Sequence, residues 1–414
     1  MKKVVVTGMG TVSPFGMGVQ VLWENISQGR NGIRHITEFP TDGLCCSVGG
    51  VLTGFAPEKY LSRQYLSTMD IFEQMGYVAA LEAVEDAGLQ WDRSNSYHIG
   101  IIGGSAIGGM TTAKEEMERF LKSRGELRPG VFAVPKMEID MLPGWLAILM
   151  GVRGANLAVN TACSTGNYAL SIGKSLLQQG LLDVVIVVCS DKSVTALSIA
   201  GFCRMRALAK MWEPDPTRSI RPFDRNRSGT LFGDGASALV LETEEHAVRR
   251  GAKIYGEIAG VGLSDDAYHI AAPEPEGNSL VFAMQSALKN AGVLPDEVEY
   301  INAHGTGTPY NDVIETRSIK KVFGEAAYRI PISSTKSMLG HQLGAASATE
   351  AIICLKILQE GILPPTINLD EPDPECDLDY IPYHPRQKNI SIILSNSFAF
   401  GGHNACVVFR KYPS

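Results

Sequence analysis

The stretch Thr161–Leu177 reads TACSTGNYALSIGKSLL, and Lys336–Ile352 reads KSMLGHQLGAASATEAI. Each combines an apolar strand, a turn of small residues that bears a Cys or a His, and a long helical pattern. A second related pair, Gly233–Leu241 and Gly401–Phe409, places a glycine turn before an apolar strand. These pairs suggest two related halves that join near Glu244–Ala259. Because glycine turns that feed strands are common in α/β proteins, the duplication is a hypothesis at this point.

Short apolar runs and helical patterns alternate along the rest of the chain. The runs expected to form strands are Val4–Val6, Ile99–Ile102, Val184–Val188, Ala238–Leu241, Tyr300–Ala303, Ile390–Leu394 and Ala405–Phe409. The patterns expected to form helices include Asp70–Ala87, Asn167–Gln179 and Ala345–Leu358. This alternation indicates an α/β protein with buried mixed sheets.

Composition excludes several classes of protein. The 414 residues are 45% hydrophobic and 20% charged, which argues against intrinsic disorder. The net charge of −7 argues against a nucleic-acid binder. No apolar run approaches the roughly 20 residues of a membrane helix, and the short run after Met1 is not a secretion signal. We therefore expect a cytoplasmic protein that binds neither nucleic acid nor membrane.

Glycine and cysteine are distributed in different ways. The 43 glycines exceed the typical share of roughly 7% and cluster in turns between apolar runs. Such turns allow the backbone to bend sharply or to approach another group closely. The eight cysteines are scattered without a CxxC pair, so neither a zinc site nor a disulfide framework is expected. We expect reduced thiols.

One cysteine lies in a distinctive setting. Cys163 follows the apolar run Leu157–Val159, stands in the turn Asn160–Asn167 and precedes a helical pattern. At a helix N-terminus, free N–H groups and the helix dipole favour a thiolate. The same N–H groups suit an oxyanion formed by attack on a carbonyl. The alternative is a buried structural cysteine.

Three further turns carry residues suited to catalysis. They are Asn302–Pro309, Ser333–His341 and Ser397–Asn404. The first contains His304 directly after an apolar strand, and the second contains Lys336 and His341. Glu350 follows on the next helix, where it could pair with Lys336. Taken singly, these are also consistent with a core histidine, a surface lysine and a plain glycine turn; together with Cys163 they favour a catalytic site.

The four segments together resemble the β-ketoacyl-[acyl carrier protein] synthases, and within them the type II (KAS II) branch of the thiolase-like condensing enzymes. The matching segments are Val4–Gly8, Thr161–Cys163, Arg221–Asp224, Gly233–Ala236, His304–Thr306, Thr335–Ser337, Gly340–His341, Pro364–Asn368 and Phe398–Asn404. The resemblance spans essentially the whole chain. It implies a dimer and an α/β, thiolase-like, five-layered αβαβα fold built from two pseudo-repeated halves. Residues 1–250 would carry the nucleophile, and residues 251–414 the catalytic histidines and the lysine.

The resemblance also implies a reaction. Cys163 would accept an acyl group from an acyl carrier protein thioester. A malonyl thioester would then lose CO₂, and its carbanion would attack that acyl group to give a 3-oxoacyl product. His304 and His341 would stabilise the enolate oxygen, while Lys336, partnered by Glu350, would act structurally and electrostatically. No metal or organic cofactor is required, because the phosphopantetheine arrives on the carrier protein.

The same resemblance implies several binding positions. Backbone N–H groups of Cys163 and Phe400 would form the oxyanion hole, and the Phe400 ring would gate the nucleophile. Ile107 would limit the depth of the acyl pocket, and Thr306 and Thr308 would contact the phosphopantetheine arm. The substrate-binding positions implied are Ile107, Thr306, Thr308 and Phe398.

The sequence departs from the family pattern in two places. Housekeeping members carry several basic residues near positions 61–70, whereas here only Arg63 remains. Arg63, Arg128 and Arg206 are the residues expected to contact the carrier protein. Ala399 stands where the family usually has Gly, so a stiffer Phe400 gate is expected.

Two enzyme functions follow from these features. Fatty-acid elongation is preferred on the overall motif match. The alternative is a ketosynthase of a type II polyketide or polyene pathway, towards which Thr306–Asp312 and Cys163–Thr165 lean. The chain would work as a homodimer or as a heterodimer with a chain-length-factor subunit. The chain is not expected to be a chain-length factor itself, which typically lacks the Cys, nor a thiolase, which usually replaces one His by a second Cys.

Overall fold

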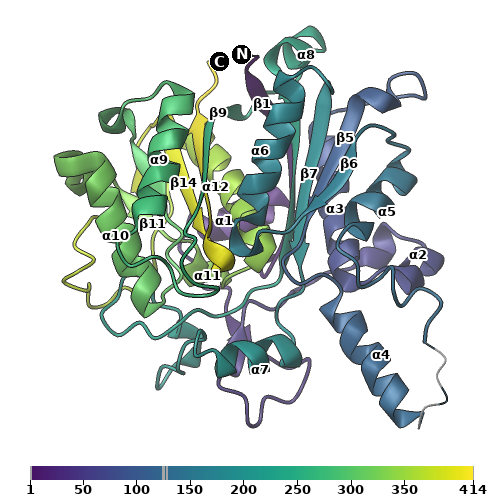
Figure 1. The fold of residues 1–414 in the computed structure, drawn as a ribbon, viewed down its shortest axis with the longest axis horizontal. Coiled ribbons are helices and arrows are strands. Elements are labelled where there is room, and N and C mark those ends of the chain that lie inside the picture. The colour runs from purple at the N-terminus through teal and green to yellow at the C-terminus, as the bar shows by residue number, and fades with distance from the viewer. Residues whose placement is uncertain (1, 124–125, 127–128, 414) are drawn as a thin grey trace.

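The computed structural model describes residues 2–123, 126 and 129–413. The main sheet is mixed and has 11 strands (Figure 1). In spatial order they are β11 (Ile332–Ser333), β10 (Tyr300–Asn302), β14 (Ile392–Phe398), β15 (His403–Arg410), β9 (Gly256–Asp265), β1 (Val4–Ser13), β8 (Gly235–Thr243), β7 (Val184–Asp191), β5 (Ile99–Gly104) and β6 (Asn156–Val159), with β2 (Gly16–Met17) beside β1. Two small sheets pair β3 (Arg34–His35) with β4 (Val48–Gly49) and β12 (Ile362–Leu363) with β13 (Arg386–Gln387).

The helices lie on both faces of this sheet and between its two parts. They are α1 (Val19–Ile26), α2 (Arg63–Thr68), α3 (Ile71–Asp86), α4 (Met110–Lys122), α5 (Met141–Met150), α6 (Thr165–Gln178), α7 (Ala196–Arg204), α8 (Glu244–Arg249), α9 (Asn278–Ala291), α10 (Pro309–Phe323), α11 (Lys336–Leu339) and α12 (Ala346–Glu360). The strands and helices expected from the apolar patterns are all present, with boundaries shifted by a few residues. β1 is the largest extension, since it continues to Ser13.

The strand order is symmetrical about the contact between β1 and β9. Outward from β1 come β8, β7, β5 and β6, and outward from β9 come β15, β14, β10 and β11. On each side the three outermost strands run parallel to one another, and the strand next to them is antiparallel. The related sequence pairs therefore occupy equivalent places, because β8 corresponds to β15, and β6 with α6 corresponds to β11 with α12.

The helices complete five layers. The central helices α6 and α12 pack against each other, and each contacts strands of both halves of the sheet. On one outer face α3 and α5 cover β1, β7, β8 and β5, whereas on the other α9 covers β9 and β15 and α10 packs on α9 (Figure 1). This is the thiolase-like αβαβα order that the sequence predicts.

Glycines in β1 and β9 allow two equivalent helix contacts. A Cβ at Gly8 in β1 would lie 2.1 Å from the carbonyl oxygen of Ala83 in α3. A Cβ at Gly262 in β9 would lie 1.9 Å from the carbonyl oxygen of Ala283 in α9. Any side chain at either position would push the helix off the sheet. Part of the glycine surplus therefore serves this close packing in both halves.

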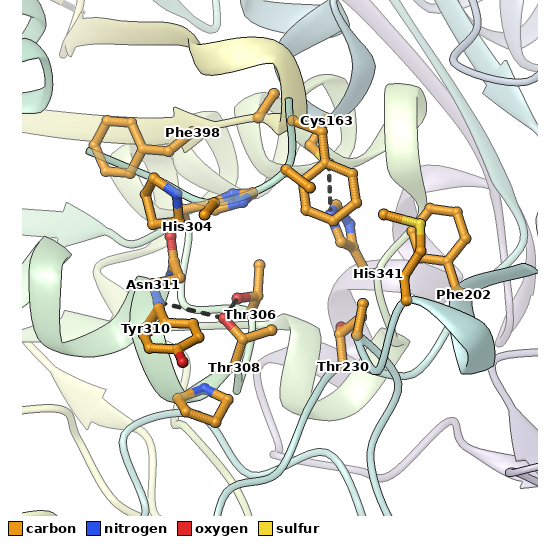
Figure 2. A pocket seen from close by; sticks show the side chains of 18 of the residues that line it. Cys163, Phe202, Thr230, His304, Thr306, Thr308, Tyr310, Asn311, His341 and Phe398 are labelled. Atoms are coloured by element: carbon orange, nitrogen blue, oxygen red, sulfur yellow. Dashed lines mark hydrogen bonds between the residues drawn. The ribbon is translucent and has the colours of Figure 1, made fainter. Parts of the chain in front are cut away.

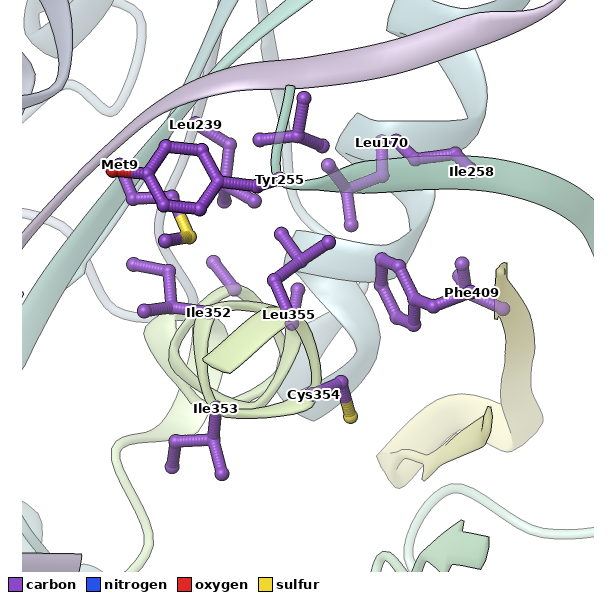
Figure 3. Packing of buried hydrophobic residues seen from close by; sticks show 14 of the residues in the cluster. Met9, Leu170, Leu239, Tyr255, Ile258, Ile352, Ile353, Cys354, Leu355 and Phe409 are labelled. Atoms are coloured by element: carbon purple, nitrogen blue, oxygen red, sulfur yellow. The ribbon is translucent and has the colours of Figure 1, made fainter. Parts of the chain in front are cut away.

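The largest hydrophobic cluster surrounds α12. Leu355 and neighbouring apolar residues of this helix meet Leu239 of β8, Ile258 of β9, Phe409 of β15 and Leu170 of α6 (Figure 3). Because nearly every residue of α12 is buried, the helix is apolar on all sides rather than amphipathic. This packing fixes the position of the polar turn that precedes α12.

The structure corrects the expectation for the cysteines. Cys45 and Cys203 form a disulfide, with their Cα atoms 5.8 Å apart, and they are separated by 158 residues in sequence. The bond links the loop before β4 to the last turn of α7. The pair has no short-range motif, because the fold alone brings the two segments together. Among the described residues, the other six cysteines are free and buried.

Within the described part of the chain, none of the helices has both the length and the apolar character needed to cross a bilayer.

Candidate active site

The first catalytic turn connects β6 to α6. Cys163 lies in the 3-10 turn Ala162–Ser164, directly before Thr165 begins α6, and only 8% of its surface is exposed. Ala162 has a positive φ of 48°, which tightens the turn. The Asn160 side chain holds this geometry by accepting a hydrogen bond from the Ala162 N–H at 3.1 Å. The thiol is therefore presented at the start of the helix, as expected.

The second turn is equivalent to the first and carries His341. It follows β11 and α11, and leads through the 3-10 turn Leu343–Ala345 into α12. Leu343 has a positive φ of 47°, close to the value at Ala162. His341 Nε2 lies 3.0 Å from the sulfur of Cys163 (Figure 2). The two halves of the fold thus bring one reactive side chain each into contact.

His304 reaches the same point from the end of β10. Its backbone N–H and that of Gly305 both donate to the carboxylate of buried Glu315, each at 2.9 Å. The imidazoles of His304 and His341 have centroids 5.5 Å apart and lie nearly perpendicular. The Cys163 sulfur and one nitrogen of each imidazole all lie within 4.8 Å of one another. Figure 2 shows the three side chains converging on one space.

A buried ion pair lies behind these groups. Lys336 Nζ is 2.5 Å from the Glu350 carboxylate, and both side chains are almost completely buried. The predicted pairing of these two residues is therefore confirmed. Because the pair is shielded from water, the positive charge of Lys336 acts on the nearby thiol and imidazoles.

Burial keeps the Cys163 thiol protonated. It raises the pKa of Cys163 to about 12, although the charge of Lys336 and the backbone N–H groups of Phe400 and Cys163 act in the opposite direction. The position at a helix start favours a thiolate, whereas burial favours the neutral thiol. The helix start and the lysine are present, but removing the sulfur from water outweighs them. Those N–H groups of Cys163 and Phe400 nevertheless face the sulfur, as an oxyanion hole requires.

Both imidazoles are neutral. Burial, followed by the charge of Lys336, lowers the pKa of His304 and the pKa of His341 well below the usual 6.5. His341 contributes a further lowering of the His304 pKa. A neutral imidazole has one N–H donor and one acceptor nitrogen, so each can donate a hydrogen bond to an anionic oxygen without carrying a charge.

Cys163, His304 and His341 line a cavity of about 350 Å³. Thr306 and Thr308 lie on one wall, with their hydroxyl oxygens 3.0 Å apart, and Phe398 packs edge-on to His304 with centroids 6.0 Å apart. Phe400 also lines the cavity and stacks on Phe202 of α7, with ring centroids 5.8 Å apart.

Other predicted positions lie elsewhere. Ile107 is not among the residues lining this cavity; it packs against a hydrophobic cluster that contains Phe232 and Leu343. Arg206 lines the cavity, whereas exposed Arg63 at the start of α2 does not. Arg128 lies outside the described residues.

The sequence did not reveal part of the cavity lining. Three residues of this part are Phe202 in α7, Met205 directly after α7, and His269 in the loop after β9. His269 Nδ1 accepts hydrogen bonds from the N–H groups of Ala271 and Ala272, which leaves Nε2 as its free ring nitrogen. Neither segment carries a strand-end motif. A basic cluster around Arg204 and Arg206 is the one sequence feature that points to this part of the lining.

The Cys163, His304 and His341 atoms also form a set that a soft metal ion could bind. The condensation chemistry implied by the resemblance uses none, and the absence of a metal requirement stays a prediction.

Two family models match the chain. The model described as "Beta-ketoacyl synthase, N-terminal domain" matches residues 1–247, and "Beta-ketoacyl synthase, C-terminal domain" matches residues 255–370. The chain belongs to the β-ketoacyl synthase family. A curated relative from Synechocystis sp., named 3-oxoacyl-[acyl-carrier-protein] synthase 2, is 43% identical over 99% of this chain and 98% of its own length.

Solved structures of the family agree with the fold. The ishigamide ketosynthase/chain length factor superposes with a TM-score of 0.92 at 35% identity and covers 100% of both chains. A type II polyketide synthase acyl-carrier protein in complex with its ketosynthase, bound to the hexaketide, gives a TM-score of 0.91 at 31% identity, over 99% of this chain and 100% of the other.

Proposed function

We propose that the protein catalyses a decarboxylative Claisen condensation in fatty-acid elongation. An acyl group held on Cys163 would react with malonyl-[acyl carrier protein] to give 3-oxoacyl-[acyl carrier protein]. The observation that carries the proposal is the 3.0 Å contact between Cys163 Sγ and His341 Nε2 in a buried cavity that also contains His304. The curated relatives named 3-oxoacyl-[acyl-carrier-protein] synthase 2 support it.

In the first half-reaction Cys163 is the nucleophile. Its sulfur attacks the carbonyl of the acyl thioester, and the N–H groups of Cys163 and Phe400 hold the resulting oxyanion. The proton of the thiol ends on the pantetheine sulfur that leaves. An N–H at His341 Nε2 stabilises the negative charge as it develops on the Cys163 sulfur.

In the second half-reaction the malonyl group loses CO₂. The electron pair of the broken C–C bond moves onto the thioester oxygen as an enolate, which accepts hydrogen bonds from His304 and His341. Two neutral donors suit this step, because both imidazoles retain an N–H at neutral pH. The enolate carbon then attacks the acyl carbonyl, the bond to Cys163 breaks, and the thiolate that leaves takes up one proton from solvent water. The charges of Lys336 and Glu350 set the electrostatic field around these groups.

The substrates would arrive on a partner. Thr306 and Thr308 would contact the phosphopantetheine arm, and Arg206 at the cavity with Arg63 and Arg128 would contact an acidic carrier protein. Phosphopantetheine is part of that partner, so no further cofactor is required. We assign the nucleophile to a unit comprising residues 1–250, and the histidines and Lys336 to residues 251–414. The protein would act in the cytoplasm as a dimer, either of two identical chains or with a chain-length-factor-like subunit.

A second function is the extension of unsaturated or oxo chains in a type II polyketide or polyene pathway. It is favoured by the close structural likeness to polyketide and ishigamide ketosynthases. The two functions differ in the acyl chain accepted. Transfer of saturated acyl chains at higher kcat/KM supports elongation, whereas preference for 3-oxo or polyenoyl chains supports the alternative.

The central test is acylation of Cys163. Incubation with an acyl carrier protein thioester should add the mass of the acyl group to the wild-type chain, and Cys163→Ala should abolish that addition. A mass shift that persists in Cys163→Ala contradicts the proposal. Cys163→Gln supplies a second measurement, because it should release CO₂ from malonyl-[acyl carrier protein] without forming product; loss of CO₂ release contradicts the roles of His304 and His341.

A further inference from the structure

A buried carboxylate outside the cavity ties two of its loops together. Asp191, the last residue of β7, is completely buried. It accepts hydrogen bonds from the Ser105 hydroxyl at 2.6 Å and from the N–H groups of Ala106, Ile107 and Gly344 at 2.9, 3.1 and 2.7 Å. In the part of the chain that the structure describes, no Lys or Arg pairs with it.

These donors come from both sides of the site. Ser105 to Ile107 follow β5, and Gly344 lies three residues after His341. The two loops are in tight contact, since a Cβ at Gly344 would lie 2.7 Å from both the Ala106 nitrogen and an Asp191 oxygen. Asp191 therefore holds the segment with Ile107 against the turn that carries His341.

The contacts close into a ring around the nucleophile. The Ala106 carbonyl accepts from the Asn160 side chain at 3.1 Å, and Asn160 in turn accepts from the Ala162 N–H at 3.1 Å. His341, whose turn is bonded to Asp191 through Gly344, completes the ring by its contact with the sulfur of Cys163. Moving Asp191 would therefore alter both sides of the Cys163–His341 contact.

We propose that Asp191 is a positioning residue that sets the Cys163–His341 geometry and fixes the loop that carries Ile107. The role of Ile107 rests on the proposed function, whereas the Cys163–His341 geometry does not. An ionised carboxylate suits the task, because it only accepts hydrogen bonds and can satisfy all the surrounding donors at once. An asparagine of the same size would turn two N–H donors towards N–H groups that need an acceptor.

Electrostatics and positioning predict opposite effects for Asp191→Asn. The negative charge of Asp191 raises the pKa of Cys163, so removing that charge alone should speed alkylation of the thiol. Displacing His341 from the sulfur should slow it, because the forming thiolate loses its hydrogen bond. We expect Cys163 in Asp191→Asn to react with iodoacetamide about tenfold more slowly than in the wild type. An unchanged or faster rate overturns the proposal.

Asp70 provides a matched control. It is also a buried carboxylate, at the start of α3, and it accepts from the Phe72 N–H and from the backbone N–H and hydroxyl of Thr112 in α4. Asp70→Asn should lower stability while leaving the Cys163 alkylation rate of the folded protein unchanged. If Asp70→Asn and Asp191→Asn slow the alkylation of Cys163 equally, general destabilisation explains the effect and the proposal is overturned.

Ser105→Ala tests the acyl-pocket side even if Asp191→Asn fails to fold. It removes one donor to Asp191 and the acceptor of the Gly108 N–H, so the ratio of long-chain to short-chain acyl transfer should rise, and Cys163 alkylation should slow less than in Asp191→Asn. An unchanged ratio contradicts the Ile107 part of the proposal. If the wild type takes no acyl group from any carrier thioester, the proposed function fails, yet the alkylation comparison still decides the role of Asp191.

Discussion

At the residue scale, Cys163 shows how burial decides the state of a nucleophile. The features that favour a thiolate are present, but burial raises the pKa of Cys163 to about 12 and leaves the resting thiol neutral. Lys336 supplies the largest opposing effect. A thiol held in this way should react slowly with solvent-borne electrophiles, and in the proposed mechanism its charge would be shared with a carbonyl and the oxyanion-hole donors.

Lys336→Met should shift the pH profile of Cys163 alkylation to higher pH. Without the positive charge the pKa of Cys163 rises, so the rate at neutral pH should fall about tenfold, equivalent to one pKa unit. The measurement is iodoacetamide alkylation against pH on protein shown to be folded by circular dichroism. Glu350→Gln, which keeps the lysine, serves as the control and should not shift the alkylation profile of Cys163 to higher pH. An unshifted profile in Lys336→Met contradicts the electrostatic role.

At the scale of elements, the proposed Phe400 gate lies in the turn between β14 and β15. Phe400 begins the 3-10 turn Phe400–Gly402, and Ala399 before it has an extended backbone with φ of −120° and ψ of 159°. An alanine adopts this conformation without strain. The stack of Phe400 on Phe202 couples the turn to α7, so the proposed Phe400 gate would open only by breaking that contact.

Ala399→Gly should loosen the gate. The added backbone freedom should lower the free energy of unfolding by about 0.5–1 kcal/mol and increase the rate of acyl transfer to Cys163. Urea denaturation and time-resolved mass spectrometry of the acyl-enzyme check the two effects. Ala252→Gly, in the loop after α8, tests loss of a methyl group outside the gate. A rate increase in Ala252→Gly, or none in Ala399→Gly, counts against a stiff gate.

At the scale of the whole molecule, one covalent bond joins distant parts of the N-terminal half. The Cys45–Cys203 disulfide spans 158 residues and anchors the end of α7, which carries Phe202. A cross-link over such a long loop restricts the unfolded chain and thereby stabilises the fold.

Reducing this bond should lower the free energy of unfolding by about 2–4 kcal/mol. Urea denaturation with and without a thiol reductant measures the difference. The double variant Cys45→Ser with Cys203→Ser should have the lower stability in both conditions, while Cys46→Ser should keep the redox response. Identical wild-type stability in both conditions would refute the stabilising role.

Much of the architecture follows from local sequence. Strand-end turns of small residues in equivalent places predicted the two halves and singled out Cys163, His304 and His341, which the fold brings together in one cavity. The Lys336–Glu350 pair was predicted from spacing and the family resemblance. The wall formed by Phe202, Met205 and His269 was not predicted, because these residues reach the cavity through tertiary packing without a local motif.

The sequence by itself determined the order of strands, turns and helices and the identity of the reactive groups, since these depend on apolar periodicity and residue chemistry within short windows. Only the tertiary structure decided that Cys163 is protonated, that Cys45 is bonded to Cys203, and that Asp191 joins the loop of Ile107 to the turn of His341. Each of these depends on burial or on contacts between residues far apart in the chain. No local pattern encodes them, because solvent exclusion and proximity arise only when the two halves pack together.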